Sequence, residues 1–382
     1  MTGGERRIAK PLLAVGQRVN EKLVVDRELG EGAFAEVYRV QHSHLGPQAL
    51  KLFRDMVSRE AASGMMHEVS ILITLAHPHI IRVFDAGTVR TSAGRRGYMT
   101  MEYMPGGNLH ALLRSHEWMV PVDEVVTVLR QAAEGLAVAH ERTRPIVHRD
   151  LSLANVLITN DDTGLRAKVS DFGLARETDQ LAMVASAQGT VAYMPPEVLR
   201  GGCGYSRAGD VWSLGTIAYH LLTNHYPYDG DDTAARSFSL ERFNRPLLPP
   251  SAFNDDVDPA LDRLVTDMLS VDPEGRPATA REVARRVAAL AAPVEHAGAS
   301  GERAGVSGEP AGAPAADPPA QPPAPAGGER AGRQLRALVA LSREPGRLPD
   351  AADQLARLID EHPDLARRHL PRLRMWRRGV VM

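Results

Sequence analysis

Cysteine and long apolar runs are nearly absent from this sequence. Cys203 is the only cysteine among 382 residues, which excludes an intramolecular disulfide and a thiolate metal cluster and fits a reducing cytosol. The strongest apolar stretch, VWSLGTIAYHLL at 211–222, is shorter than the roughly 18 residues that a membrane-spanning helix needs. Residues 1–17 contain no apolar core of a signal peptide. We therefore expect a soluble, cytoplasmic protein without a transmembrane segment, with 211–222 as a buried helix.

An excess of charge of one sign is missing as well. The chain has 45 Lys and Arg against 47 Asp and Glu, a net charge of -2. This balance gives no indication of a nucleic-acid partner or an acidic interaction tail. The heavy use of Ala, Arg, Gly and Pro is typical of bacteria with GC-rich DNA.

The character of the sequence changes along the chain. Five short β-branched or aromatic runs between 23 and 104 predict strands: LVVDREL, AEVYRVQH, QALKLF, RVFDAGTV and GYMTMEY. Between the third and fourth run, MMHEVSILITLA predicts a helix with Val69, Leu72, Ile73 and Ala76 on its apolar face. Helical patterns dominate 122–291. A small β-rich unit followed by a larger helical unit is the expected α+β architecture.

The C-terminal quarter has a different composition. Residues 292–332 are rich in Ala, Gly and Pro and lack the apolar side chains that would offset the entropy of ordering, so a disordered linker is expected. A helical, basic segment is predicted over 333–382. About fifty residues bury little surface alone, so this tail either docks on the body or binds a protein partner, with an acidic membrane as a third alternative. The predicted division is an N-terminal extension, a main domain, a linker and a tail, at 1–19, 20–291, 292–332 and 333–382.

Three stretches near the N-terminus and centre carry residues suited to phosphate chemistry. ELGEGAFAEVY at 28–38 places Gly30 and Gly32 between two predicted strands, where backbone N–H groups can cover phosphates; by itself such a turn is a weak signal. Lys51 lies within an apolar strand and requires a partner, for which Glu68 on the following helix is suited. An ordinary surface pair is the alternative interpretation.

The stretch IVHRDLSLANVLI places Asp150 and Asn155 five residues apart in a loop, and AKVSDFGLAR adds Asp171. A carboxylate here can orient a substrate hydroxyl, while the other two side chains supply hard oxygen ligands. Such ligands together with phosphate oxygens suit Mg²⁺, and the absence of a His and Cys cluster argues against zinc.

In this order and spacing, the motifs resemble those of the eukaryotic-type (Hanks-type) protein Ser/Thr kinases over about residues 20–291. The Gly-rich turn, strand lysine, helix glutamate, HRD with Asn, DFG and GTVAYMPPE are all present. The resemblance implies a bilobal fold and transfer of the ATP γ-phosphoryl group to protein substrates, in the class of non-specific Ser/Thr kinases. It implies ATP and Mg²⁺ as cofactors, with Mn²⁺ as an alternative ion.

The resemblance also implies roles for single residues. Lys51 and Glu68 would form an ion pair, Asp150 would be the catalytic base, and Asn155 and Asp171 would hold the metal. His148 and Phe172 would stack with Leu72 and Val83, Asp210 would anchor the catalytic loop, and Glu197 would pair with Arg276. The expected nucleotide-binding positions are Leu29, Gly30, Gly32, Val37, Ala49, Lys51, Met101, Glu102, Met104, Asn108 and Leu157. Among them, Val37, Ala49 and Leu157 would surround adenine with Met101 as gatekeeper, and Asn108 would contact the ribose. Ser186 and then Thr178 are the candidate autophosphorylation sites.

The catalytic loop departs from the family at one place. Most Ser/Thr kinases read HRDLKPxN, with a lysine on the γ-phosphate, whereas this chain has Ser152 and Ala154 at the positions where a cation is usual. Losing one such donor typically reduces the rate about 100- to 1,000-fold, so we expect a slow enzyme, with Lys168, Arg176 or the substrate as candidate sources of a substitute cation. A pseudokinase that binds nucleotide and signals through its tail is the alternative.

Overall fold

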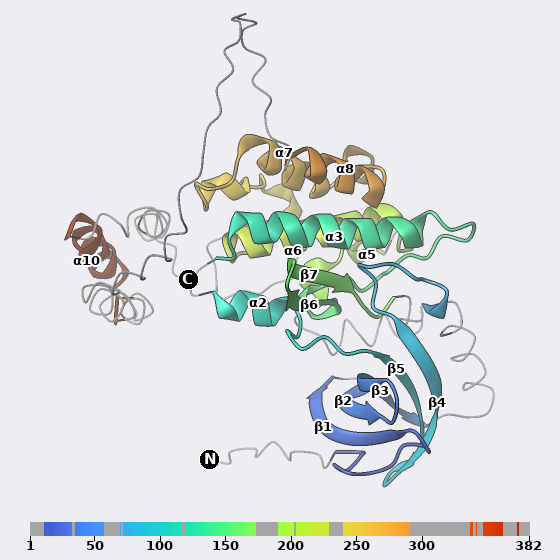
Figure 1. The fold of residues 1–382 in the computed structure, drawn as a ribbon. Coiled ribbons are helices and arrows are strands. Elements are labelled where there is room, and N and C mark those ends of the chain that lie inside the picture. Colours follow the sequence, from blue (N-terminus) through green and yellow to red (C-terminus); the bar gives the residue numbers. More distant parts are fainter. Residues whose placement is uncertain are drawn as a thin grey trace, which may run out of the picture. The chain divides into compact units, whose positions relative to one another are not determined.

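The computed structural model describes residues 11–32, 35–56, 69, 72–116, 119–172, 190–201, 204–228, 240–290, 337–338, 341, 347–361 and 373. The chain divides into two compact units, residues 1–290 and residues 291–382. The first unit consists of a five-stranded sheet followed by a helical part (Figure 1). The predicted bilobal α+β fold is therefore confirmed.

The sheet of the small lobe is antiparallel, with strand order β1-β2-β3-β5-β4. Each predicted run became one strand, and the second run agrees with β2 at both ends. The strand bounds are β1 Leu23–Glu31, β2 Ala35–His42, β3 Gly46–Met56, β4 Val83–Thr91 and β5 Gly94–Glu102.

The two faces of this sheet have separate cores, because side chains alternate along a strand. Leu50 and Leu52 of β3 are fully buried on the outer face, in a cluster with Tyr38 and Val40. Lys51 lies between them in sequence and therefore points to the opposite face. Ala49 on that inner face belongs to the main core, which continues into the helical lobe.

The helix expected around 65–76 has a different apolar face from the one predicted. Val69 and Leu72 are buried, but Ile73 is 48% exposed and Ala76 is also exposed. Leu75 is buried in their place at 2% exposure. The chain turns at Thr74, so helical spacing no longer applies beyond it, and Leu75 is directed inward by the turn.

The larger lobe is mainly helical. Helix α6 runs through its centre and is buried without interruption from Gly209 to Thr223, as predicted for 211–222. The described elements are α2 Leu109–Ser115, α3 Val122–His140, η1 Leu153–Asn155, β6 Val156–Asp161, β7 Gly164–Val169, η3 Thr190–Tyr193, α5 Pro196–Leu199, α6 Arg207–Thr223, η4 Leu240–Asn244, η5 Pro250–Ala252, α7 Pro259–Met268, η6 Pro273–Gly275 and α8 Ala280–Leu290.

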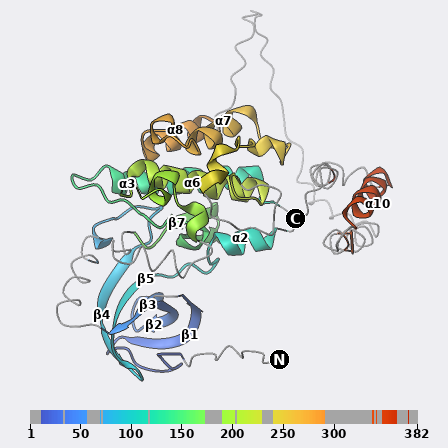
Figure 2. The same ribbon diagram turned by 180° about the vertical axis from the view of Figure 1, so that it is seen from behind.

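Local sequence explains how these elements begin and meet. Asp258 caps α7 by accepting hydrogen bonds from the N–H groups of Ala260 and Leu261 at 2.7 and 3.0 Å. A Cβ on Gly215 of α6 would stand 2.8 Å from the Met268 Cβ, so only glycine allows α6 and α7 to approach this closely. The short β6–β7 hairpin lies on the side of the helices that faces the sheet (Figures 1 and 2).

The second unit contains helix α10, Leu348–Glu361. Its buried residues recur at helical spacing on one face: Ala351, Ala352, Leu355, Leu358 and Ile359. Each helix in the described part of the chain is too short or too polar to span a lipid bilayer.

Candidate active site

Asp210, at the start of α6, binds the backbone of the catalytic loop. Its carboxylate accepts hydrogen bonds from the backbone N–H groups of His148, at 2.7 Å, and Arg149, at 3.0 Å. His140 of α3 contacts the same carboxylate through Nε2 at 2.8 Å. The predicted anchoring contacts of Asp210 are thus present. The participation of His140 was not predicted, because nothing in its local sequence marks it.

Two residues of the site have left-handed backbone conformations that are uncommon outside glycine. Arg149 has φ of 72° and Asp171 has φ of 60°. The hydrogen bond from the Arg149 N–H to Asp210 helps to hold the first of these. Such conformations persist where surrounding contacts fix them, and they cluster at functional sites.

Asp150 and Asn155 lie in contact, as their spacing suggested. The Asn155 Nδ2 donates to the backbone oxygen of Asp150 at 2.6 Å and to its Oδ2 at 3.1 Å. The other carboxylate oxygen, Oδ1, is buried and has no hydrogen-bond partner among the described residues. Burial raises the pKa of the Asp150 carboxyl, and Asp171 acts in the same direction, against His148 and Asn155. Asp150 therefore presents a free acceptor oxygen with increased proton affinity.

Lys51 and Asp171 form an ion pair across the site. The Lys51 Nζ lies 2.9 Å from the Asp171 Oδ1, and the side chains are 18% and 23% exposed. The end of β7 is joined to the catalytic loop by Ser170, whose N–H and Oγ both donate to the Asn155 backbone oxygen, at 2.9 and 3.1 Å. Strand lysine, DFG aspartate and catalytic-loop asparagine are thereby brought together.

Residues predicted to surround adenine come from neighbouring strands. Val37 of β2 is paired in register with Lys51 of β3, and Ala49 of β3 is paired with Met101 of β5. Ala49 and Met101 are 6% and 5% exposed. Leu157 of β6 approaches from the other lobe and forms a bridge with Asn108.

The connection after β5 supplies polar backbone groups. The Glu102 N–H donates to the Arg82 carbonyl at 2.9 Å. Met104 is buried at 6% exposure. The Asn108 Oδ1 caps α2 by accepting from the Ala111 N–H at 3.4 Å. The expected ribose contact of Asn108 stays a prediction.

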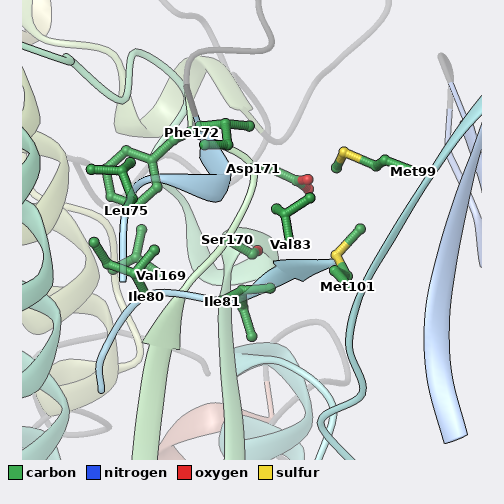
Figure 3. Close-up of a pocket in the computed structure, with 11 residues that line it drawn as sticks. Leu75, Ile80, Ile81, Val83, Met99, Met101, Val169, Ser170, Asp171 and Phe172 are labelled. Atoms are coloured by element: carbon green, nitrogen blue, oxygen red, sulfur yellow. The ribbon is translucent and has the colours of Figure 1, made fainter. Parts of the chain in front are cut away.

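The interior behind the nucleotide positions is almost filled. His148 is fully buried, its Nε2 lies 2.7 Å from the Ser170 carbonyl, and its ring centroid is 4.9 Å from that of Phe172. A cavity of about 10 Å³, room for about one water molecule, lies between Phe172, Leu72, Val83 and Met101. Figure 3 shows Phe172 with Leu75 on one side and the two methionines, Met99 and Met101, on the other. The predicted hydrophobic stack is present.

Both glycines of the Gly-rich turn, Gly30 and Gly32, lie among the described residues. Among the described residues, no heavy atom lies within 4 Å of a Cβ built on Gly30, and only the Ala35 oxygen, at 3.7 Å, lies near one on Gly32. The backbone is therefore open to close approach by a ligand. Leu29, beside it, is 38% exposed.

Ser152 is buried at 7% exposure and precedes the short helix η1, in which Leu153 is fully buried. Lys168 does not replace the missing cation. Its Nζ binds both carboxylate oxygens of Glu102, at 2.7 and 2.8 Å, and is directed to the connection between the lobes. The expectation that Lys168 substitutes for the missing lysine was wrong. Strand alternation on β7 and the nearby Glu102 carboxylate determine the direction of the Lys168 side chain. Arg176 lies outside the described residues.

Glu197 and Arg276 form the predicted buried pair. The two guanidinium nitrogens Nη1 and Nη2 each lie 2.9 Å from one Glu197 oxygen. Arg276 also donates to the carbonyls of Ser270 and Ala208, and its guanidinium lies 4.9 Å from the Trp212 ring centroid. This pair is structural, since its donors are fully used.

The donor set fits a hard divalent cation. The Asp171 carboxylate and the Asn155 side-chain oxygen are the ligand types that Mg²⁺ takes. The buried Oδ1 of Asp150 also has no partner within the described ranges. Three predicted residues, Glu68, Thr178 and Ser186, lie outside the described residues.

Comparisons with known proteins agree with this geometry. PknB from Mycobacterium tuberculosis, a serine/threonine-protein kinase, is 31% identical over 67% of this chain and 40% of its own length. RqkA from Deinococcus radiodurans, a DNA damage-responsive serine/threonine-protein kinase, is 34% identical over 65% of this chain and 36% of its own length. The chain thus spans about two fifths of such relatives.

Solved structures include the kinase domain of PknI from Mycobacterium tuberculosis. It is 30% identical, has a TM-score of 0.53 and covers 72% of this chain and 99% of that domain. The family model described as protein kinase domain matches residues 23–287. The chain belongs to the protein kinase family.

Proposed function

We propose that the protein is a serine/threonine protein kinase that uses ATP and Mg²⁺ to phosphorylate Ser and Thr side chains of protein substrates. The observation that carries this proposal is Asp150, whose buried Oδ1 has no partner in the part of the chain that the structure describes, while Asn155 fixes the other side of the carboxylate. An acceptor held in this way suits the proton of a substrate hydroxyl.

The other groups have complementary roles in this proposal. Lys51 carries the positive charge for the ATP phosphates, and Asn155 and Asp171 hold the cation. Bound Mg²⁺ would supply charge neutralisation of the phosphate oxygens. Asp150 orients the attacking hydroxyl and accepts its proton, and Asp210 keeps the loop in place through the N–H groups of His148 and Arg149.

Retention of all these groups favours an enzyme over a pseudokinase, although Ser152 replaces the lysine. A kinase that turns over about 1 to 100 times per second would be reduced to about 0.001 to 1 per second by losing one donor. That rate suffices for autophosphorylation, for which Ser186 and Thr178 are the proposed sites. The cytoplasmic location and a protein partner for the tail stay predictions.

The test is incorporation of labelled phosphate from ATP into the purified protein and into a generic basic protein substrate. Wild type with Mg²⁺ or Mn²⁺ should incorporate label, and Asp150→Asn should not, with phosphosites mapped by mass spectrometry. Binding of ATP by wild type without any transfer would instead support the pseudokinase alternative.

A further inference from the structure

The segment that precedes the matched kinase domain is built into the small lobe. The Gly16 N–H donates to the Val25 carbonyl at 2.8 Å, the Val25 N–H to the Gln17 carbonyl at 2.9 Å, and the Val19 N–H to the Leu23 carbonyl at 2.9 Å. The segment thereby pairs with β1, an outermost strand of the sheet, and covers backbone groups that would otherwise be unpaired.

Further toward the N-terminus, the segment crosses onto the outer face of the sheet. Leu13 is 2% exposed and belongs to the outer core with Leu23, Tyr38 and Leu52. The Leu13 N–H donates to the Tyr38 hydroxyl at 3.2 Å. A buried leucine with a bonded backbone indicates a fixed attachment.

The attachment ends on a buried carboxylate. Glu36 of β2 is 4% exposed, and its Oε2 accepts hydrogen bonds from the Leu12 N–H at 3.0 Å and from the Tyr38 hydroxyl. Burial, followed by the bond to Glu36, raises the pKa of Tyr38, so the phenol stays protonated and donates. A carboxylate this deeply buried is stable only with such partners.

The same carboxylate is connected to the Gly-rich turn. The Arg54 Nη2 on β3 lies 3.5 Å from the Glu36 Oε1 and 2.8 Å from the Glu31 Oε2. Glu31 ends β1 between Gly30 and Gly32. Arg54 also follows Lys51 by three residues on the same strand, so one strand carries both the phosphate-facing lysine and the contact to the turn.

We propose that residues 11–13, acting through Glu36 and Arg54, position the Gly30–Gly32 turn for binding of the ATP phosphates. Glu36 is thus a positioning residue for nucleotide affinity, on the face of the sheet opposite to the nucleotide. This inference rests on the proposed function only in taking ATP as the ligand.

The first experiment uses the full chain with Glu36→Gln and Arg54→Gln, singly and together. Glutamine keeps the acceptor for the Leu12 N–H but removes the charge that holds Arg54. Each change should raise the Kd of a non-hydrolysable ATP analogue with Mg²⁺, and the KM for ATP, about three- to fivefold. The Kd of the double variant should be no higher than that of the single variant that binds less tightly, because both changes act through one contact. The value of kcat at saturating ATP should not change.

The second experiment removes residues 1–14, and with them Leu12 and Leu13. The deletion should raise the Kd by a similar factor and should add nothing to Glu36→Gln. Asp26→Asn is the matched control, because it breaks the β1–β2 ion pair of Asp26 with Arg39 without contact to Arg54; it should leave the Kd unchanged. If the deletion variant does not fold, the Kd measured for Glu36→Gln tests the positioning role.

The outcomes separate this inference from the proposed function. Normal nucleotide affinity in Glu36→Gln, with only a lower Tm, overturns the positioning role and leaves the kinase proposal intact. A raised Kd in Glu36→Gln but not in a folded deletion overturns the part assigned to residues 11–13. Failure of wild type to bind nucleotide overturns both.

Discussion

Two ion pairs of the kinase domain, Lys51 with Asp171 and Glu197 with Arg276, differ in how fully their bonding capacity is used. Both have contacts of 2.9 Å. Arg276 is fully buried, binds its carboxylate through two nitrogens and donates to backbone carbonyls, whereas Lys51 and Asp171 are partly exposed and meet through one contact. A saturated pair holds the fold together, while an unsaturated pair at a cleft can exchange partners with a ligand.

The largest effect should come from breaking the unsaturated pair. Lys51→Met or Asp171→Asn should lower the phosphorylation rate at least about 1,000-fold, since each removes a charge from nucleotide or metal placement. The free energy of unfolding should change by less than about 1 kcal/mol, because the pair is partly exposed. Label incorporation and chemical denaturation measure the two quantities. A residual rate within tenfold of wild type would contradict the assigned roles.

Breaking the saturated pair should give the opposite result. Arg276→Met leaves Glu197 without its partner and should lower the free energy of unfolding by about 3 to 5 kcal/mol. Arg281→Met is the matched control, because Arg281 binds Glu141 with side chains 46% and 48% exposed; its cost should be below about 1 kcal/mol. Equal costs in urea denaturation would remove the distinction between the two classes of pair.

Restoring the cation that is missing from the catalytic loop should increase the activity of the site. Ser152→Lys should raise kcat about 100-fold, because it restores a donor for transition-state charge. The lysine stem can extend along the loop toward solvent from this buried position. Ser152→Met has a similar length without the charge and should give no increase. Equal kcat values for the two variants would show that a cation here does not limit the rate.

The smallest expected effect is on the pH dependence of kcat/KM. Burial raises the pKa of Asp150, and the charged form is the base, so kcat/KM should fall as pH falls through that raised pKa. The acidic limb should therefore lie above the ordinary aspartate value of about 3.9. Circular dichroism at each pH identifies the range in which the protein stays folded. An acidic limb at or below the ordinary aspartate value in folded protein would be inconsistent with the raised pKa.

Much of the site could be predicted because its signals are local. Asp150 and Asn155 are five residues apart, and Lys51 lies in an alternating strand, so short windows of sequence contain both the residue and its setting. The contacts of Asp210 and Arg276 came from the family resemblance. They join distant residues, and no pattern within a window of sequence predicts them.

What could not be predicted depends on tertiary packing. Lys168 meets a carboxylate 66 residues away, and Leu13 meets a hydroxyl 25 residues away. The inward direction of Leu75 follows from a turn at the end of a helix, where periodicity no longer applies. In each case the partner is selected by the folded neighbourhood and not by local propensity.

The Asp210 carboxylate also has a consequence for the order in which the protein is assembled. Its three donors, on His140, His148 and Arg149, precede it by 70, 62 and 61 residues. During synthesis the catalytic loop leaves the ribosome before the group that shapes it exists, and contacts of this sequence separation form late. A chain interrupted before α6 contains Lys51, Asp150 and Asp171 but lacks the carboxylate that binds the backbone N–H groups of His148 and Arg149. We therefore expect the catalytic loop to reach its final conformation only when the centre of the larger lobe has folded.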